Sequence, residues 1–200
     1  MPQKRTLLLA ALMLAAAAMI GAAAFLLAPG LKPGGTGVAL VGGPFTLTDQ
    51  SGKRVTEKDF LGRYTLIYFG YTYCPDVCPT QLQVLAAALE EMGPTASKIT
   101  PVFISIDPAR DTPEVMKAYV ENFGAQFIGL TGSADEIAAV AKAYRVFYAK
   151  AGTGQDYKMD HTSLMYLMGP DGKFIKYFDY TTDPKALAGE LSQAVAASSP

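Results

Sequence analysis

Cysteine and histidine are scarce in this chain, and their scarcity limits the kinds of site that it can build. The 200 residues include two cysteines, Cys74 and Cys78, and one histidine, His161. Structural zinc sites need four ligands, and catalytic zinc sites usually use more histidine or carboxylate than this chain offers. No cysteine precedes Cys74, so a lipid-modified cysteine near the N-terminus is excluded as well.

An excess of positive charge is also missing. The chain contains 17 Lys and Arg against 18 Asp and Glu. Lys4 and Arg5 are the only charged residues before position 30, so the remainder carries 15 minus 18 charges, a net −3. Proteins that bind nucleic acid need a basic face, and this balance argues against one. The loop "AGTGQD" at residues 151–156 lacks the Lys and the Ser or Thr that would bind a nucleotide, so we expect a hairpin tip there.

The N-terminal region does contain a long apolar run. Residues 7–28 include no charged residue, and a helix of this length would rise about 33 Å, enough to cross a hydrocarbon core of about 30 Å. We expect a retained transmembrane anchor at 7–28, because a cleaved signal peptide, the alternative, usually has a shorter apolar region. The basic residues before it would keep residues 1–6 in the cytoplasm and place the rest of the chain outside. Residues 29–43 are rich in Gly and Pro and predict a flexible linker, leaving residues 44–200 as one folded domain.

Strand-like and helix-like segments alternate through the domain. We expect a hairpin within residues 45–56 and strands at residues 64–71, 101–107, 125–130, 163–168 and 173–180, the last two joined by a "GPDG" turn. Helices are expected to begin at Pro79, at Pro113, at the Ser-x-x-Glu capping box of Ser133 and at Pro184. The pattern predicts an α/β fold, a mixed central sheet flanked by helices, with an N-terminal hairpin. Because the two cysteines fall between a central strand and the following helix, the arrangement is thioredoxin-like.

The cysteine pair lies in "YFGYTYCPDVCPTQL", residues 68–82, with three residues between Cys74 and Cys78. Pro79 suits the first turn of a helix, so we expect Cys78 near the N-cap, where free N–H groups and the helix dipole favour a thiolate. A structural disulfide is one interpretation, although so short a closed loop adds little stability. A redox dithiol is the second, although that motif usually has two residues between its cysteines. A metal site is the third, and it requires a further ligand.

His161 is the candidate for that further ligand. A lone histidine is often only a surface or turn residue. In a thioredoxin-like fold, however, we expect the loop with His161 to lie beside the first helix, near the cysteines. Two thiolates with a single imidazole suit copper, above all Cu(I), which accepts three-coordinate sites. The residues therefore favour a copper site formed by Cys74, Cys78 and His161.

Three segments, "YFGYTYCPDVCPTQL", "VFISIDPARDTPEVMKAY" and "DHTSLMYLMGPDGKF", resemble the successive signatures of the Sco/SenC family of copper proteins. The resemblance covers about residues 44–195 and extends to the N-terminal anchor. It implies a single-pass inner-membrane protein whose domain faces the periplasm or the mitochondrial intermembrane space and binds Cu(I) or Cu(II) through Cys74, Cys78 and His161. It also implies a partner, the cytochrome c oxidase subunit with the dinuclear copper site, to which the protein delivers copper or whose thiols it prepares. Other copper chaperones and thioredoxin-like reductants would be further partners.

Three more residues are candidates for supporting roles. Asp76, inside the cysteine loop, would steer a partner or keep water near the metal, or would simply be an exposed turn residue. Asp107 ends a central strand on the cysteine side, and the resemblance associates its position with the site. An Asp-Pro turn before the next helix is the alternative for Asp107. The thioether of Met159 would be a soft ligand or a packing group.

An enzymatic function is the alternative to copper delivery. A thiol-disulfide oxidoreductase or thiol peroxidase would use Cys74 or Cys78 as the attacking thiolate, and His161 would only tune it. A copper or redox sensor is a third reading of the same residues. The metal and enzyme interpretations differ in what His161→Ala does to Cu(I) binding.

Overall fold

The computed structural model of the chain describes residue 13, residues 41–179 and residues 183–197. The chain divides into two compact units, residues 1–39 and 40–200, and the fold below is that of the second unit. Apart from Met13, the expected anchor at residues 7–28 lies outside the described residues, as does the expected linker up to residue 40. Within the described residues, none of the helices has the length and apolar character needed to span a membrane.

A seven-stranded mixed sheet forms the centre of the unit. Its strands are β1 Thr46–Asp49, β2 Arg54–Thr56, β3 Tyr64–Gly70, β4 Ile99–Ser105, β5 Ile128–Thr131, β8 Met165–Met168 and β9 Phe174–Phe178. Their order across the sheet is β2-β1-β5-β4-β3-β8-β9. Strands β3, β4 and β5 are parallel, whereas β1 runs antiparallel to β5 and β8 antiparallel to β3. The expected mixed central sheet is confirmed.

Strands β3 and β4 are the buried middle of this sheet. Every residue of both strands is buried. A parallel pair that is covered on both faces must be apolar along its whole length, which explains the continuous run "YTLIYFG". The register pairs Tyr64 with Ile99 and Gly70 with Ser105. Both strands therefore end at the same edge of the sheet, where the loops that follow them meet.

Antiparallel hairpins occupy the two edges of the sheet. In the first, β1 pairs with β2 so that Leu47 lies opposite Val55. Its turn contains Gly52 at φ 84°, a left-handed conformation that glycine adopts without steric cost. In the second, β8 pairs with β9 around the "GPDG" turn. Both hairpins were expected, and both are confirmed.

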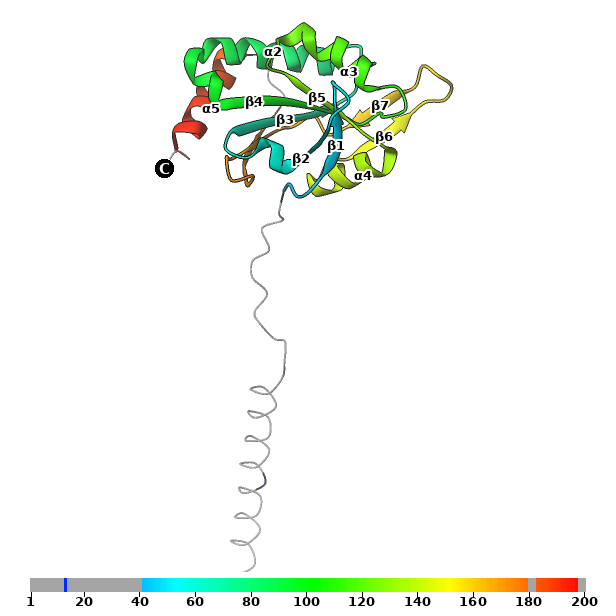
Figure 1. Ribbon diagram of the computed structural model, residues 1–200, viewed down its shortest axis with the longest axis horizontal. Helices are drawn as coiled ribbons and strands as arrows, with labels where there is room; N and C mark the ends of the chain where they lie inside the picture. Colours follow the sequence, from blue (N-terminus) through cyan, green and yellow to red (C-terminus); the bar gives the residue numbers. More distant parts are fainter. Residues whose placement is uncertain (1–12, 14–40, 180–182, 198–200) are drawn as a thin grey trace, which may run out of the picture. The chain divides into compact units, whose positions relative to one another are not determined.

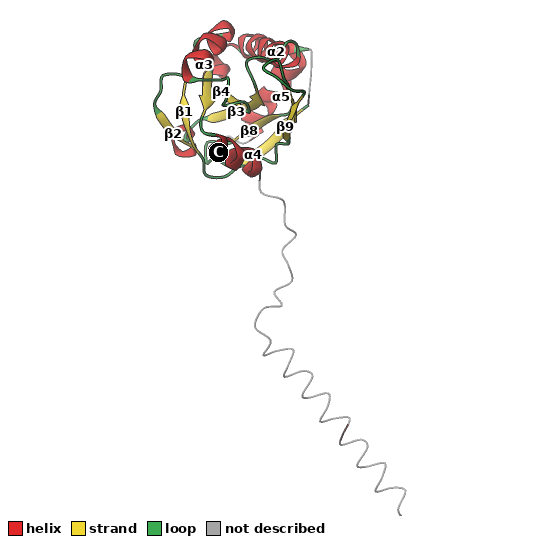
Figure 2. Ribbon diagram, turned by 90° about the vertical axis from the view of Figure 1, so that its right-hand side faces the viewer, coloured by secondary structure: helices red, strands yellow, loops and turns green. Residues whose placement is uncertain are grey.

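Helices cover both faces of the sheet. They are α2 Val77–Glu91, α3 Pro113–Val120, α4 Ala134–Ala143 and α5 Pro184–Ala197, with short 3-10 segments η1 Glu57–Phe60, η2 Gly93–Lys98 and η3 Glu121–Phe123. Figures 1 and 2 show α2 and α3 on one side of the sheet and α4 on the other. Helix α5 packs against α2. The expected capping box of Ser133 and Glu136 is present at the start of α4.

A separate two-stranded ribbon carries the histidine. It consists of β6 Tyr148–Ala151 and β7 Lys158–His161, which pair only with each other. In Figure 1 this ribbon is the yellow hairpin that projects from the side of the unit. The hairpin tip expected at residues 151–156 is confirmed, but its two strands were not predicted. His161, which we expected on a loop, is the last residue of β7.

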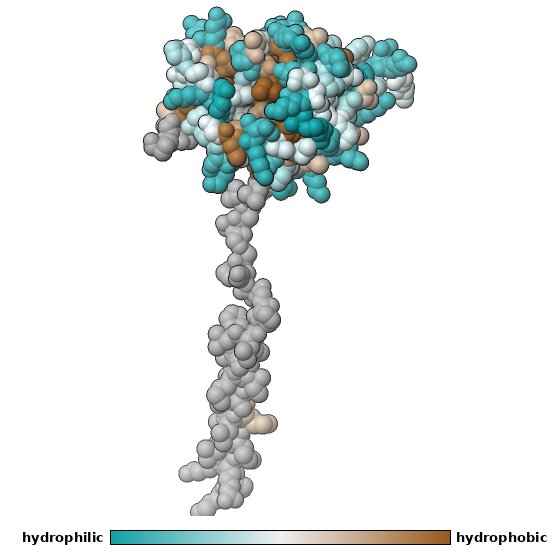
Figure 3. All heavy atoms as spheres, viewed as in Figure 1, coloured by the Kyte–Doolittle hydropathy of each residue, from teal (hydrophilic) through white to brown (hydrophobic). Residues whose placement is uncertain are grey.

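The surface of the unit also contains an apolar cavity. On the face that Figure 3 shows, hydrophobic side chains emerge between hydrophilic ones. A cavity of about 300 Å³ is lined by Phe45 and Phe60 from the N-terminal hairpin region and by Met168 at the end of β8. No cysteine or histidine is among its described lining residues. The cavity is therefore separate from the thiol and imidazole groups.

Candidate metal centre

The cysteine loop, residues 71–78, joins β3 to the first turn of α2. The carbonyl of Tyr71 accepts a hydrogen bond from the N–H of Cys74, with an N···O distance of 3.3 Å. The N–H of Cys78 donates to Cys74 Sγ over 3.4 Å. Both thiols are free, and Cys74 is half-buried whereas Cys78 is 0% exposed. The loop thus holds one partly accessible sulfur, that of Cys74, next to one buried sulfur, that of Cys78.

Helix α2 begins earlier than expected, and this changes which sulfur the helix end serves. Its first residue is Val77, and Asp76 rather than Cys78 occupies the N-cap position. Pro79 lies within the first turn, where its missing N–H leaves no helical bond unmade. The free N–H groups of Asp76 and Cys78 are instead directed at the Cys74 sulfur. The positive helix end therefore stabilises a thiolate at Cys74, and not, as we expected, at Cys78.

The two thiols differ strongly in acidity. The pKa of Cys74 is lowered to about 5, chiefly because the Cys78 thiol donates a hydrogen bond to its sulfur. Burial opposes this shift, while the two backbone N–H groups and the charge of His161 reinforce it. The pKa of Cys78 is raised, because its proton is held by Cys74 and its sulfur is buried. At neutral pH the pair therefore carries a thiolate at Cys74 and a thiol at Cys78.

His161 reaches this pair from the end of β7. Its Nε2 lies 3.5 Å from Cys78 Sγ, and its Nδ1 lies 3.0 Å from the carbonyl oxygen of Thr162. A carbonyl can only accept, so Nδ1 carries a proton and donates it to this oxygen, and Nε2 is the ring nitrogen that faces the sulfur. The rings of Tyr68 and Tyr71 stand edge-on to the imidazole, at centroid distances of 6.2 and 6.1 Å. The imidazole is thus oriented as a metal-binding histidine usually is, with its second nitrogen bound to a carbonyl.

The structure brings all three expected ligand residues together. The contacts run pairwise, from Cys74 to Cys78 and from Cys78 to His161. Among the described residues, no group of three or more His, Cys, Asp and Glu side chains already has the geometry of a formed metal site. A soft metal would therefore have to draw the two sulfurs and the imidazole around itself. Two thiols and one imidazole are nevertheless the donor set that suits copper.

The two acidic residues that we expected to support the site are placed differently. Asp76 is exposed, and its carboxylate makes no helix-capping hydrogen bond. Asp107 is 3% exposed, and its two oxygens accept from Arg110 Nε at 2.5 Å and from the Tyr157 hydroxyl at 2.6 Å. Asp107 therefore braces the loops beside the site and has little left to offer a metal. Met159 is half-buried and packs against the core.

Two residues that support the cysteine loop were not identified from the sequence. A Cβ added at Gly70 would lie 2.9 Å from Cys78 Sγ and 2.7 Å from the ring of Phe103. Glycine at the end of β3 is therefore what allows the buried sulfur to approach the strand. A glycine that ends an otherwise continuous apolar strand is a sequence signal for such a close approach.

Asp111 is the second such residue. Its carboxylate, which is 1% exposed, accepts from the N–H and hydroxyl of Thr72 at 3.1 and 2.6 Å and from the Ser105 hydroxyl at 2.5 Å. It thereby ties the start of the cysteine loop to the end of β4. Burial raises the pKa of Asp111 in spite of these hydrogen bonds. Nothing in the sequence around Asp111 indicates a bond to Thr72, so its role emerges only from the fold.

Fold and site together define a class of protein. A dithiol loop between a central parallel strand and the next helix, in a mixed sheet covered by helices, makes this a thioredoxin-like α/β protein that carries an additional imidazole. Comparison with known proteins then gives the family. The SCO1/SenC family model matches residues 34–196, and the chain belongs to the SCO1/SenC family.

Several relatives show how close the match is. The chain is 49% identical over 160 residues to the mitochondrial SCO1 homolog of Homo sapiens, a match that covers 78% of this chain and 53% of the human protein. ScoI of Bradyrhizobium japonicum, solved with copper bound, is 49% identical with a TM-score of 0.72 and covers 77% of this chain and 99% of its own. The chain spans about half the length of the first curated relatives it matches.

A more distant structure bears on the thiols. BsSco, described as a member of the Sco family of cytochrome c oxidase assembly proteins in which a disulfide switch was identified, is 26% identical to this chain. The TM-score is 0.61, and the match covers 76% of this chain and 91% of BsSco. The thioredoxin-like α/β fold predicted from the sequence is thus confirmed by the structure and by its solved relatives.

Proposed function

We propose that this protein is a copper metallochaperone, which binds copper through Cys74, Cys78 and His161 and delivers it to the dinuclear copper centre of cytochrome c oxidase. The observation that carries the proposal is the distance of 3.5 Å between Cys78 Sγ and His161 Nε2, with the Cys74 sulfur next to both the N–H and the thiol of Cys78. The copper-bound ScoI relative supports the choice of metal.

The three proposed ligands suit a metal ion that is bound only temporarily and then transferred. Soft thiolates with one imidazole select Cu(I) over harder ions. Cys74 already carries the charge that a thiolate ligand needs, because its pKa is lowered to about 5, whereas Cys78 must give up its proton when the metal enters. Cys74 and His161 are half-buried and Cys78 is covered. An acceptor thiol would therefore displace Cys74 and His161 first and Cys78 last.

The location follows from the expected anchor. Residues 7–28 would hold the chain in the inner membrane by a single span, with residues 29–43 as a tether and the domain in the periplasm or the mitochondrial intermembrane space. In that position the domain could reach the oxidase subunit with the dinuclear copper site. The described residues of the second unit carry the thioredoxin-like fold that this location would present to the oxidase.

A Cu(I) titration tests the proposed ligands. The reduced full chain should bind one Cu(I) per molecule, and we expect His161→Ala, Cys74→Ala and Cys78→Ala each to weaken binding by at least about 10-fold, in competition with a colorimetric Cu(I) chelator. Asp135→Asn is the matched control, because its exposed carboxylate lies in the first turn of α4, on the other side of the sheet from α2. Equal affinity of His161→Ala and the wild type would rule out the proposed ligand set.

A thiol-disulfide oxidoreductase is the second candidate, and the acidity of the thiols favours it. The Cys74 thiolate would attack an acceptor disulfide, and the acceptor's leaving sulfur would take up a proton. Cys78 would then displace the second acceptor sulfur, closing a Cys74–Cys78 disulfide and leaving the acceptor with two thiols. A thioredoxin-like dithiol would have to reduce the chain again. Turnover of a disulfide substrate that survives His161→Ala, together with unchanged Cu(I) affinity in that variant, would favour this candidate.

A further inference from the structure

One cationic side chain stands between the cysteine loop and the ribbon that carries His161. The Arg110 guanidinium lies 3.6 Å from the ring centroid of Tyr157 in the ribbon and 4.6 Å from that of Tyr73 in the cysteine loop. Its Nε donates to Asp107 over 2.5 Å, and its Nη1 donates to the carbonyl of Gln155 over 3.2 Å. We call Tyr73, Asp107, Arg110 and Tyr157 the Arg110 cluster.

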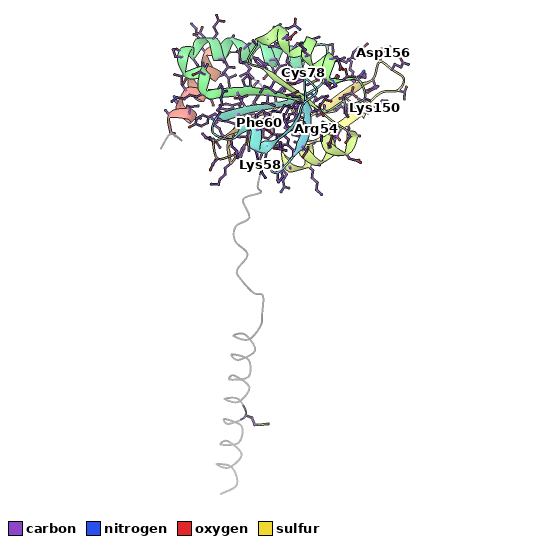
Figure 4. All side chains as sticks on the ribbon, viewed as in Figure 1. Arg54, Lys58, Phe60, Cys78, Lys150 and Asp156 are labelled. Carbon is purple, nitrogen blue, oxygen red and sulfur yellow. The ribbon has the colours of Figure 1, made fainter. Side chains whose placement is uncertain are left out.

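Direct hydrogen bonds close the cluster around the guanidinium. The Tyr157 hydroxyl donates to the second Asp107 oxygen over 2.6 Å, and the Tyr73 hydroxyl donates to Asp156 over 3.1 Å. Figure 4 places Asp156 at the tip of the ribbon and Cys78 inside the body of the unit. Three segments distant in sequence are therefore joined here, namely the cysteine loop, the loop after β4 and the ribbon tip.

Strand β7 connects this cluster to the metal centre. Side chains alternate between the two faces of a strand, and Tyr157, Met159 and His161 are half-buried whereas Lys158 and Asp160 between them are exposed. Tyr157, the residue before β7, and His161, the last residue of β7, thus lie on the same face. Tyr157 rests on Arg110, and His161 rests on Tyr71 and Cys78.

Other contacts also hold the ribbon: Tyr148 and Met159 pack against the core, and the backbone of Met159 hydrogen-bonds to Tyr71. Its strands share no ladder with the seven-stranded sheet. At its base, the hydrogen bonds between Phe147 and Thr162 join the ribbon's own two ends. At its tip, the ribbon forms three hydrogen bonds to the body of the unit: Gln155 to Arg110, Asp156 to Tyr73 and Tyr157 to Asp107. The Arg110 cluster is therefore what joins the tip of the ribbon to the cysteine loop and to the loop after β4.

We propose that Arg110 is a positioning residue: its guanidinium holds the β6–β7 ribbon against the cysteine loop and thereby sets the reach of His161 to Cys78. Opening the cluster would release the ribbon and withdraw the imidazole while both sulfurs stay on the core. The expected effect of Arg110 on copper binding rests on the proposed copper site. The position that Arg110 gives to His161 is a property of the metal-free protein. A merely structural Arg110 would support the start of α3 and leave the imidazole in place.

The experiment compares Arg110→Gln with Arg54→Gln in the purified full chain. Arg54→Gln is the matched control. It removes the same charge from a second arginine that forms an ion pair, because Arg54 in the edge strand β2 pairs with Glu136 of α4. In the metal-free protein, amide hydrogen exchange of residues 158–161 should be at least about 10-fold faster in Arg110→Gln than in Arg54→Gln. With copper, Arg110→Gln should weaken the nitrogen hyperfine signal of the Cu(II) complex and speed Cu(I) release to a chelator by about 10-fold, the usual effect of losing an orienting partner of a ligand.

Two further variants keep the test independent of folding defects at Arg110. Tyr157→Leu removes the stacked ring and should reproduce Arg110→Gln, whereas Tyr157→Phe keeps the ring and should retain most of the wild-type Cu(II) signal. Unchanged exchange in β7 for both Arg110→Gln and Tyr157→Leu would overturn the proposal. If His161→Ala matches the wild type in copper binding while exchange in β7 still rises in Arg110→Gln, the proposed ligand set fails and the positioning role stands.

Discussion

Gly70 shows how a missing side chain can shape a metal centre. It ends β3 directly beneath the buried sulfur, at a point where a Cβ would be 2.9 Å from Cys78 Sγ. The first prediction is that Gly70→Ala lowers the free energy of unfolding by about 1 to 3 kcal/mol, as overpacking of a core does, and weakens Cu(I) binding because Cys78 must move. Urea unfolding and a Cu(I) competition titration measure the two effects.

The control is Gly189→Ala in α5, where no atom lies within 4 Å of the added Cβ. An exposed helical glycine replaced by alanine should raise the free energy of unfolding by about 0.5 to 1 kcal/mol. If Gly70→Ala behaved like Gly189→Ala, the close approach of strand and sulfur would not be required.

The buried carboxyl of Asp111 makes stability depend on pH. Because its pKa is raised, the native state binds this proton more tightly than the unfolded state does. Its contribution to stability is full below the unfolded value of about 4 and is lost as pH rises through the native pKa. We therefore predict that the wild type loses stability relative to Asp111→Asn as pH increases from about 4. Urea unfolding of both proteins across this range measures the difference, which a pH-independent gap would contradict.

At the scale of single residues, the sequence identified the three ligand candidates but not their environment. Cys74, Cys78 and His161 stood out because they are the only residues of their kinds. Gly70 and Asp111 did not, because a glycine and an aspartate acquire their roles only from neighbours that the chain brings near through folding. Asp107 was associated with the site, and its actual partners, Arg110 and Tyr157, lie on a loop and a ribbon that no local pattern connects.

At the scale of elements, the start of α4 can be predicted from the sequence, because its capping box is a local pattern. The Ser133 hydroxyl accepts from the Glu136 N–H over 3.2 Å, and Glu136 accepts from the Ser133 N–H over 2.8 Å. We predict that Ser133→Ala costs about 1 kcal/mol of unfolding free energy, the usual value of an N-cap. Thr153→Ala at the exposed ribbon tip is the control and should change it by less than about 0.5 kcal/mol. Thermal or urea unfolding measures the free energy of unfolding of both variants. Equal losses in Ser133→Ala and Thr153→Ala would show that the capping box does not stabilise the protein.

The elements that sequence reasoning found are those with a strong local signal. The continuous apolar runs gave β3 and β4, and glycine turns gave both hairpins of the sheet. Strand β4 nonetheless begins at Ile99, not at Pro101, and β5 begins at Ile128, not at residue 125, because pairing with neighbouring strands decides where a ladder starts. The strands of the ribbon, "YAKA" and "KMDH", are short and partly polar. They pair only with each other, and so short a pattern predicts no strand from its own residues.

At the scale of the whole molecule, residues 40–200 form one compact unit. All the described strands and the helices α2 to α5 belong to it, as do the core residues identified among the described residues. We predict that a fragment beginning at Leu40 unfolds in one cooperative transition, with a free energy within about 0.5 kcal/mol of that of the full chain, as expected for independent parts. Circular dichroism during urea unfolding of both chains measures this. A fragment that fails to fold would show that the N-terminal residues are needed for the fold.

The ribbon that stands outside the main sheet has a consequence for how this protein can change. Residues at its tip can be inserted or deleted without altering the register of any strand in the core, since β6 and β7 pair only with each other. A change in tip length would leave the two sulfurs in place but would shift Tyr157 and, with it, His161. The ribbon can therefore adjust the reach of one proposed ligand while the other two keep their positions on the core.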